Sequence, residues 1–237
     1  MARGALRCIA LLAVLSVLGP FPATAGGEHK EHRPPAAKRE AAATGLCMVC
    51  KVRHGEAEPE PVKATRTHEG ASYGFCSEDC AKEFTSDPLA YLPPEFPREA
   101  PGFTLTDLAG RSVSLESLKG RVVLLDFWAT WCVPCRKSMP ELQTLHERYS
   151  ARGLTVLGVS IDEKADAKVR KFIADKGFTY PVAVDSPKQP AWQEYRVKSI
   201  PAAWLIDRDG RIVAQWTGAA APAAELDARV RALVGGE

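Results

Sequence analysis

Apolar residues in the second half of the chain recur at two spacings, one typical of buried strands and one typical of helices. Residues 121–127 and 154–160 are short, nearly continuous apolar runs, as expected for strands covered on both faces. The first run is followed by apolar residues at helical spacing over residues 138–149, and the second by a similar pattern over residues 165–176. The pattern therefore predicts strand–helix–strand–helix.

The end of the chain predicts a β-hairpin and a closing helix. Residues 202–206 and 211–216 are apolar runs separated by a turn containing Asp209-Gly210, a dipeptide typical of hairpins. Residues 221–234 have the spacing of a helix. Together with the preceding elements, this order predicts an α/β fold with a mixed sheet and helices on both of its faces.

The first 25 residues have the pattern of an export signal. Arg3 and Arg7 precede an apolar run at residues 9–18, and Ala-Thr-Ala at residues 23–25 offers a cleavage site between small residues. The run is about ten residues long, well short of the ~20 that span a bilayer as a helix. We therefore expect an exported protein, periplasmic or otherwise extracytoplasmic, and membrane-tethered only if the signal is left uncleaved.

Two segments poor in bulky apolar residues divide the remainder into two blocks. Residues 26–44 mix charge, proline and alanine, which predicts a flexible linker, and residues 93–100 are proline-rich, which predicts a semi-rigid spacer. Between them, residues 45–92 form a block with four cysteines, and residues 101–237 form a larger block with two. We expect each block to be a separate domain.

Charge balance argues against nucleic acid as a partner. Cleavage after residue 25 removes two of the 31 basic residues and no acid, so 29 basic residues face 29 acidic ones. A protein without net charge lacks the electrostatic attraction that nucleic acids and acidic membrane surfaces exert on basic proteins. The 46% apolar and 25% charged composition is that of an ordinary folded protein.

The larger block carries a Cys-x-x-Cys motif at the start of a helix. Cys132-Val133-Pro134-Cys135 follows the strand at residues 121–127 and precedes the helix. A helix N-terminus stabilises a thiolate at the first cysteine, which we expect to be exposed and to attack. The second cysteine, one turn into the helix, is placed to resolve the mixed disulfide that results. This context favours redox chemistry over a metal site.

This stretch resembles the thioredoxin superfamily over residues 101–237. Residues 126–135 are similar to the thioredoxin active-site sequence, Pro140 matches the proline that kinks the following helix, and Ile200-Pro201 falls where the family has its cis-proline. Residues 103–115 and the sequence after Pro201 resemble the exported TlpA/ResA-like thiol-disulfide oxidoreductases. The resemblance implies a thioredoxin-like fold, protein thiols and disulfides as substrates, a membrane electron donor and a monomer.

The resemblance also implies roles for individual residues. Cys132 is the nucleophile, Cys135 resolves, and Pro201 shapes the substrate groove, whose expected lining is Trp131, Val133, Pro134 and Ile200. Asp126 matches a buried aspartate of thioredoxins, whose raised pKa would let it take the proton of the resolving thiol. The alternative for Asp126 is a structural residue paired with a lysine. ResA-like proteins carry a glutamate at the position of Ser138, and its absence argues against a dedicated role in cytochrome maturation.

The smaller block has the cysteine pattern of a metal site. Twenty-five residues lie between the pair Cys47 and Cys50 and the pair Cys76 and Cys80. The second pair has i, i+4 spacing at a predicted helix start with Ser77 as N-cap. The block resembles the YHS/TRASH metal-binding modules, because residues 69–80 match their aromatic and cysteine pattern. Four thiolates accept zinc or copper(I). Two structural disulfides and a second redox centre are the alternatives. His54 and His68 are expected to be loop histidines, and His146 in the larger block a surface one.

These observations support three functions. The first is an exported protein-disulfide oxidoreductase, acting as a reductase and needing no organic cofactor, with a tethered metal-binding module. The second is a metal-handling protein that serves copper-site assembly or transfers metal. The third is a peroxiredoxin-like peroxidase, which is disfavoured because the Thr/Pro-x-x-x-Thr/Ser-x-x-Cys sequence typical of that family is not present around Cys132.

Overall fold

The computed structural model contains two folded regions. The residues that it describes are 43–55, 58–163, 166–185 and 190–235. We call residues 43–92 the four-cysteine region and residues 97–235 the redox region. The predicted export signal and nearly all of the predicted linker lie outside the described residues. Within the described residues, no helix is long and apolar enough to cross a membrane.

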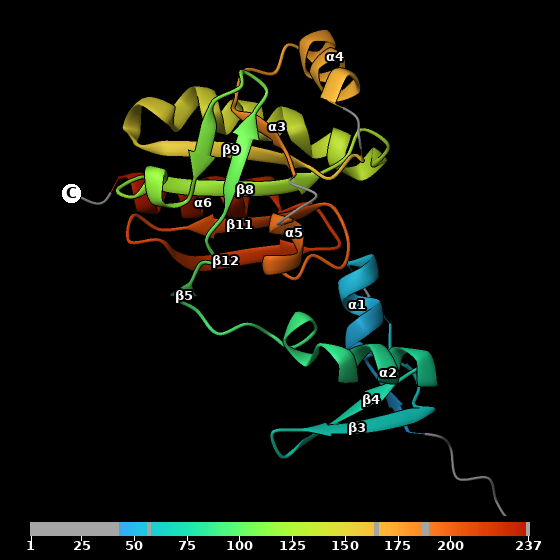
Figure 1. Cartoon of the computed structure of the whole chain (residues 1–237). Helices are drawn as coiled ribbons and strands as arrows, with labels where there is room; N and C mark the ends of the chain where they lie inside the picture. The colour runs from blue at the N-terminus through green and yellow to red at the C-terminus, as the bar shows by residue number, and fades with distance from the viewer. Residues whose placement is uncertain (1–42, 56–57, 164–165, 186–189, 236–237) are drawn as a thin grey trace, which may run out of the picture. The chain divides into compact units, whose positions relative to one another are not determined.

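The redox region is built on an eight-stranded mixed sheet (Figure 1). Its strands are β5 (Arg98–Glu99), β6 (Thr104–Asp107), β7 (Ser112–Ser114), β8 (Val122–Trp128), β9 (Leu154–Ser160), β10 (Val182–Val184), β11 (Ala202–Ile206) and β12 (Arg211–Thr217). Their spatial order is β5-β12-β11-β8-β9-β10-β6-β7. The pairs β8–β9 and β9–β10 are parallel and the others antiparallel. Every residue of β8 is buried, as its continuous apolar sequence predicts.

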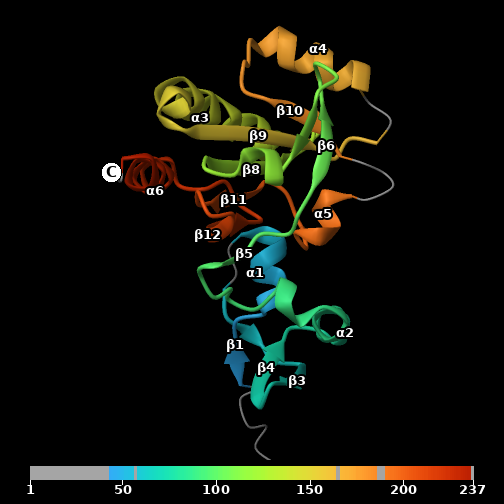
Figure 2. The same ribbon diagram turned by 60° about the vertical axis from the view of Figure 1, so that its left-hand side comes forward.

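Helices cover both faces of this sheet. They are α3 (Val133–Tyr149), α4 (Asp166–Lys176), α5 (Ala191–Glu194) and α6 (Ala223–Val234), with short 3-10 turns at Glu116–Leu118 and Ser150–Arg152. Figure 2 shows α3 and α6 side by side on one face and α5 on the other. A buried apolar cluster lies on each side of the sheet. The predicted fold class, a thioredoxin-like mixed sheet with helices on both faces, is confirmed.

The helix that follows the Cys-x-x-Cys motif begins at Val133, as the motif predicts, with Cys132 as its N-cap residue and a proline in its first turn. Two other element boundaries differ from the prediction. Part of the segment predicted as a spacer forms β5, which pairs with β12 at the edge of the sheet. At the end of the predicted linker, Thr44 opens a short strand. In both cases backbone pairing between strands outweighs the local composition.

The four-cysteine region combines short strands with two helices. Its elements are β1 (Thr44–Gly45), α1 (Met48–His54), β2 (Glu60–Pro61), β3 (Ala64–His68), β4 (Ala71–Phe75), α2 (Glu78–Ser86) and a 3-10 turn at Pro88–Ala90. Strands β3 and β4 form a hairpin, and β1 pairs with β2. The small core is aromatic: the ring of Phe84 contacts those of Phe75 and Tyr73 at centroid distances of 5.0 and 5.1 Å. Cys47 and Cys80 are buried with this core.

Candidate functional site: a dithiol and a four-sulfur cluster

The Cys-x-x-Cys motif forms a disulfide at the N-terminus of α3. Cys132 and Cys135 are bonded to each other, and Cys132 is the N-cap residue of the helix. The backbone N–H of Cys135 donates to the Cys132 Sγ at 3.2 Å. Pro134 occupies the first turn, where its lack of an N–H costs no hydrogen bond. After reduction, the same N–H and the positive end of the helix would stabilise a thiolate at Cys132.

Both sulfurs are buried, in contrast to the prediction of an exposed Cys132. The exposed fractions are 4% for Cys132 and 1% for Cys135. The expectation was wrong because the Cys132 side chain turns inward to bond Cys135 and to accept its N–H. The flanking side chains project outward instead, with Trp131 62% and Val133 49% exposed. A partner therefore meets these apolar side chains around the disulfide.

Asp126 points to the same side of the sheet as the disulfide. Successive side chains of a strand alternate between faces, and Leu124 and Trp128 of β8 belong to the cluster that contains Cys135. Asp126 lies between them in this alternation. Its Oδ2 is buried without a hydrogen-bond partner. Burial raises the pKa of Asp126 to about 7, so the carboxyl can exchange a proton near neutral pH.

A small cavity lies between Asp126 and residues of α3. Asp126, Ser138, Glu141 and Pro201 are among its lining residues, and its volume of about 20 Å³ has room for about one water molecule. Ser138 donates a hydrogen bond to the Cys135 carbonyl at 2.9 Å. Glu141, which is half-buried, was missed in the sequence. The signal was present, because Glu141 is the first carboxylate after Ser138, the position where similar proteins have a glutamate.

Two other polar side chains, Tyr180 and His146, have buried atoms without a hydrogen-bond partner. Burial, and next the charge of Asp126, raise the pKa of Tyr180, whose hydroxyl has no partner. The His146 ring lies 6.4 Å from that of Tyr180, and its buried Nδ1 is also unpartnered. Burial lowers the pKa of His146. The prediction of an ordinary surface histidine was therefore wrong, because Tyr180 and the edge of the core cover part of the ring.

A groove of about 910 Å³ opens beside the disulfide. Its lining residues are Trp131, Ile161, Asp162, Glu163, Lys168, Trp192, Val197, Lys198, Ser199 and Ile200. Trp131 and Ile200, two of the residues expected to line a substrate groove, both line this cavity. The Ile200–Pro201 bond is cis, and Pro201 itself is buried. Val133 and Pro134 are exposed and are not among the lining residues. Trp192 of α5, 38% exposed, was not anticipated.

A buried aspartate holds the turn that precedes the disulfide. Asp162 accepts hydrogen bonds from the Thr130 N–H at 2.7 Å, the Thr130 hydroxyl at 2.6 Å and the Ser160 hydroxyl at 2.8 Å. Thr130 lies two residues before Cys132. Sequence inspection missed Asp162, because no local pattern marks a carboxylate that binds a segment 32 residues away.

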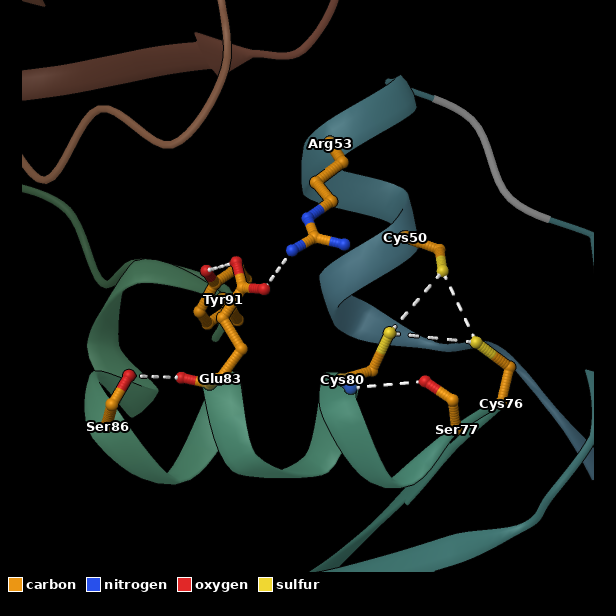
Figure 3. A network of polar contacts seen from close by, with 8 residues as sticks. All are labelled: Cys50, Arg53, Cys76, Ser77, Cys80, Glu83, Ser86 and Tyr91. Carbon is orange, nitrogen blue, oxygen red and sulfur yellow. Dashed lines mark hydrogen bonds and ion pairs between the residues drawn. The ribbon is translucent and has the colours of Figure 1, made fainter.

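The structure gathers the four cysteines of the other region into one cluster. The sulfur atoms of Cys47, Cys50, Cys76 and Cys80 all lie within 4.8 Å of one another, and none is in a disulfide. The Sγ–Sγ distances are 3.4 Å for Cys50–Cys76, 3.8 Å for Cys76–Cys80 and 4.0 Å for Cys50–Cys80 (Figure 3). Four thiolates around a zinc ion at ~2.3 Å would be roughly 3.8 Å apart, so the spacing fits a tetrahedral metal ion.

The local structure around these cysteines differs in part from the prediction. Ser77 caps α2 by accepting the Cys80 N–H at 3.2 Å, which confirms the predicted cap. Cys76 lies just before that cap rather than on the helix, so the two sulfurs do not share a helix face. Cys47 is the N-cap residue of α1. Each cysteine pair therefore brackets the start of a helix.

A polar network joins the two helices that carry the cluster. Arg53 of α1 forms an ion pair with Glu83 of α2, and the Tyr91 hydroxyl donates to the same carboxylate (Figure 3). His54 and His68 are not members of the sulfur cluster. The expectation that they are loop histidines was wrong, because His54 is the last residue of α1 and His68 the last residue of β3. The network joins α1 to α2 without using any of the four sulfur atoms.

Comparison with known proteins relates the redox region to one family. A profile of the AhpC/TSA family matches residues 97–215, half of the chain. A thiol-disulfide oxidoreductase, ResA, from Bacillus thuringiensis is 40% identical over 121 residues, which are 51% of this chain and 69% of that protein. Residues 43–92 lie outside the family match.

Solved structures show the same relationship. The thioredoxin domain of a thiol-disulfide oxidoreductase from Bacteroides vulgatus is 31% identical with a TM-score of 0.52, and the match covers 60% of this chain and 99% of that one. A secreted thiol-disulfide isomerase from Corynebacterium glutamicum is 25% identical with a TM-score of 0.52, covering 58% of this chain and 86% of that one.

Proposed function

Because the chain belongs to the AhpC/TSA family and is a thiol-disulfide oxidoreductase of the ResA type, we propose that it is an exported reductase of protein disulfides. We further propose that its four-cysteine region binds a metal ion. The proposed domains are a signal at residues 1–25, a linker at 26–44, the four-cysteine module at 45–92, a spacer at 93–100 and the redox domain at 101–237. Electrons would come from a membrane donor to a monomeric protein.

The observation that carries the redox proposal is the Cys135 N–H that donates to the Cys132 Sγ. In the reduced protein this donor supports a Cys132 thiolate, which attacks a substrate disulfide and forms a mixed disulfide. The substrate sulfur that leaves takes up a proton. Trp131 and Ile200 of the groove supply apolar contact to the substrate chain on either side of the reacting sulfurs.

Release of the substrate requires the buried Cys135 thiol to lose its proton. Asp126 is the proposed base, because its carboxyl faces the same core layer and has a pKa of about 7. The small cavity that it shares with Glu141 would pass the proton towards solvent. Cys135 then attacks Cys132, which frees the substrate thiol and restores the disulfide.

The direction of the reaction is tested by the reduction potential of the Cys132–Cys135 couple. A reductase is expected to equilibrate near the ~−270 mV of thioredoxin, and an oxidant near the ~−120 mV of DsbA. Insulin-disulfide reduction and peroxide consumption are measured with the same sample. A potential near the oxidising end would reject the reductase, and rapid peroxide turnover with no insulin reduction would favour the peroxidase.

The metal proposal rests on four thiol donors at tetrahedral spacing. Cys80, in the first turn of α2, places its sulfur at the positive end of that helix, which favours a negatively charged thiolate cluster. Zinc and copper(I) both suit sulfur ligands, and a bound metal would supply folding free energy to a region with a small core. A role in copper-site assembly is favoured if copper(I), rather than zinc, is retained.

Native mass spectrometry of protein purified without chelator tests this metal site. One ion per chain is expected, and Cys80→Ser should abolish its retention. Lys82→Ala, an exposed change on the same helix, is the matched control. A metal-free chain lighter by four hydrogens in this region would instead show two disulfides.

A further inference from the structure

Two thiols of the sulfur cluster are both close together and reachable from solvent. Cys50 and Cys76 are half-buried with their Sγ atoms 3.4 Å apart, whereas Cys47 and Cys80 are buried. A disulfide bond is about 2.05 Å long, so these sulfurs have to approach by roughly 1.4 Å to bond. An exported protein meets oxidising conditions. Thiol–disulfide exchange with an oxidised protein disulfide would take two hydrogens from this pair and reduce that disulfide to two thiols. Only two sulfur ligands would then remain, and the tetrahedral site would be lost.

We propose that the Cys132–Cys135 dithiol reduces a Cys50–Cys76 disulfide of its own chain, so that metal loading of the four-cysteine region depends on the redox region. This inference rests on the proposed reductase direction and metal site, and it names a substrate for them. The two cysteine groups are otherwise unrelated in sequence: one is a dithiol at a helix start, and the other a cluster of four free thiols.

The exchange balances as two thiol–disulfide steps. The Cys132 thiolate attacks one sulfur of the Cys50–Cys76 disulfide; that bond breaks, and the other sulfur leaves as a thiolate that is protonated or binds the metal. The Cys135 thiolate then attacks Cys132 and breaks the mixed disulfide. Two electrons have moved from the dithiol to the cluster. An external dithiol reductant restores Cys132 and Cys135.

Surface chemistry and connectivity favour this substrate. Trp131 and Val133 expose apolar surface on either side of Cys132, and Leu46, next to the first cysteine of the cluster, is 46% exposed. When the two reacting groups come into contact, these apolar side chains are removed from water, which favours the contact. The last core residue of the four-cysteine region, Tyr91, is separated from β5 by only a few residues. Joining the two reacting groups in one chain makes their encounter intramolecular, and so raises their effective concentration where the tether can span them.

The first experiment traps the intermediate in the full chain. Metal-free, reduced Cys135→Ser protein is treated with one equivalent of diamide, quenched with acid and mapped by mass spectrometry without reduction. We expect a cross-link at the mass of one chain that joins the Cys132 peptide to that of Cys50 or Cys76. A control that also carries Cys50→Ser and Cys76→Ser should lose it. Absence of the cross-link, or its appearance only at twice the chain mass, would overturn the proposal.

The second experiment follows metal uptake. Diamide-oxidised, metal-free wild type and Cys132→Ser receive the same low concentration of dithiothreitol, and zinc binding is recorded over time. Wild type should regain zinc binding on the order of tenfold faster, because a thiolate at a helix N-terminus outcompetes the weakly ionised reagent. Equal rates would refute the proposal.

Two controls separate this inference from the proposed function. Fully reduced Cys132→Ser should bind zinc as fully as wild type, and failure of both to bind would reject the metal site itself. Wild type should reduce insulin, and its failure would reject the reductase. If wild type reduces insulin and binds zinc, but regains zinc no faster than Cys132→Ser, only the proposal that the four-cysteine region is a substrate would be rejected.

Discussion

Replacing Asp126 with asparagine should stabilise the redox region by an amount that grows with pH. Burial raises the pKa of this carboxyl from 3.8 to about 7. Below pH 3.8 the carboxyl is protonated in both the folded and the unfolded chain, so it does not change the free energy of unfolding. Between the two pKa values the unfolded chain has released a proton that the folded chain still holds. The free energy of unfolding therefore falls as pH rises through this window and levels off above pH 7.

The size of the effect follows from the shift in pKa. A difference of about three units, at ~1.36 kcal/mol per unit, corresponds to a cost of about 4 kcal/mol above pH 7. Roughly 2–3 kcal/mol of this cost is incurred between pH 5 and pH 8. Asparagine does not titrate, so Asp126→Asn avoids the pH-dependent cost. Any loss from burying its amide is the same at every pH.

Denaturant unfolding of oxidised wild type and Asp126→Asn at pH 5, 6, 7 and 8 measures this difference. The control is Asp107→Asn, since Asp107 is equally buried. Burial alone would raise the pKa of Asp107, but hydrogen bonds from Arg111 lower it overall, so it stays ionised in both states across this range. Its variant should lose a constant amount of stability. A constant difference for Asp126→Asn as well would refute the reasoning, and with it the role of Asp126 as a base.

Three further outcomes are expected. Glu141→Gln should slow resolution of the mixed disulfide on the order of tenfold without changing the initial attack, as general-base assistance of this kind predicts; stopped-flow traces that show both steps unchanged would remove Glu141 from the proton route. Asp162→Ala should lower the free energy of unfolding by about 2–4 kcal/mol, because the buried Thr130 N–H and hydroxyl lose their acceptor; a loss below ~0.5 kcal/mol in urea titrations would show that water replaces it. Zinc affinity should fall as pH falls from 8 to 5, because burial raises the pKa of Cys76 to about 11 and the metal must displace its proton; a pH-independent affinity in chelator competition would argue against thiolate ligation.

Local patterns in the sequence were sufficient for the elements that carry the chemistry. The apolar run before Cys132 became the central strand β8, and the Cys-x-x-Cys motif opened a helix as predicted. Ser77 capped α2 in the same way. These features depend on residues within one or two turns of each other, so neighbouring side chains and backbone donors determine them.

The tertiary structure decided how those elements act together. Asp126 acquires its raised pKa only because β8 is covered on both faces, and Asp162 finds Thr130 only because β8 and β9 pair in parallel. Cys50 and Cys76 meet because the hairpin β3–β4 and helix α1 pack on one core. Desolvation and contacts between distant segments depend on which surfaces pack together. The local spacing of residues does not determine which surfaces pack together. The burial of Asp126, its raised pKa and the sulfur cluster therefore arise only in the folded chain.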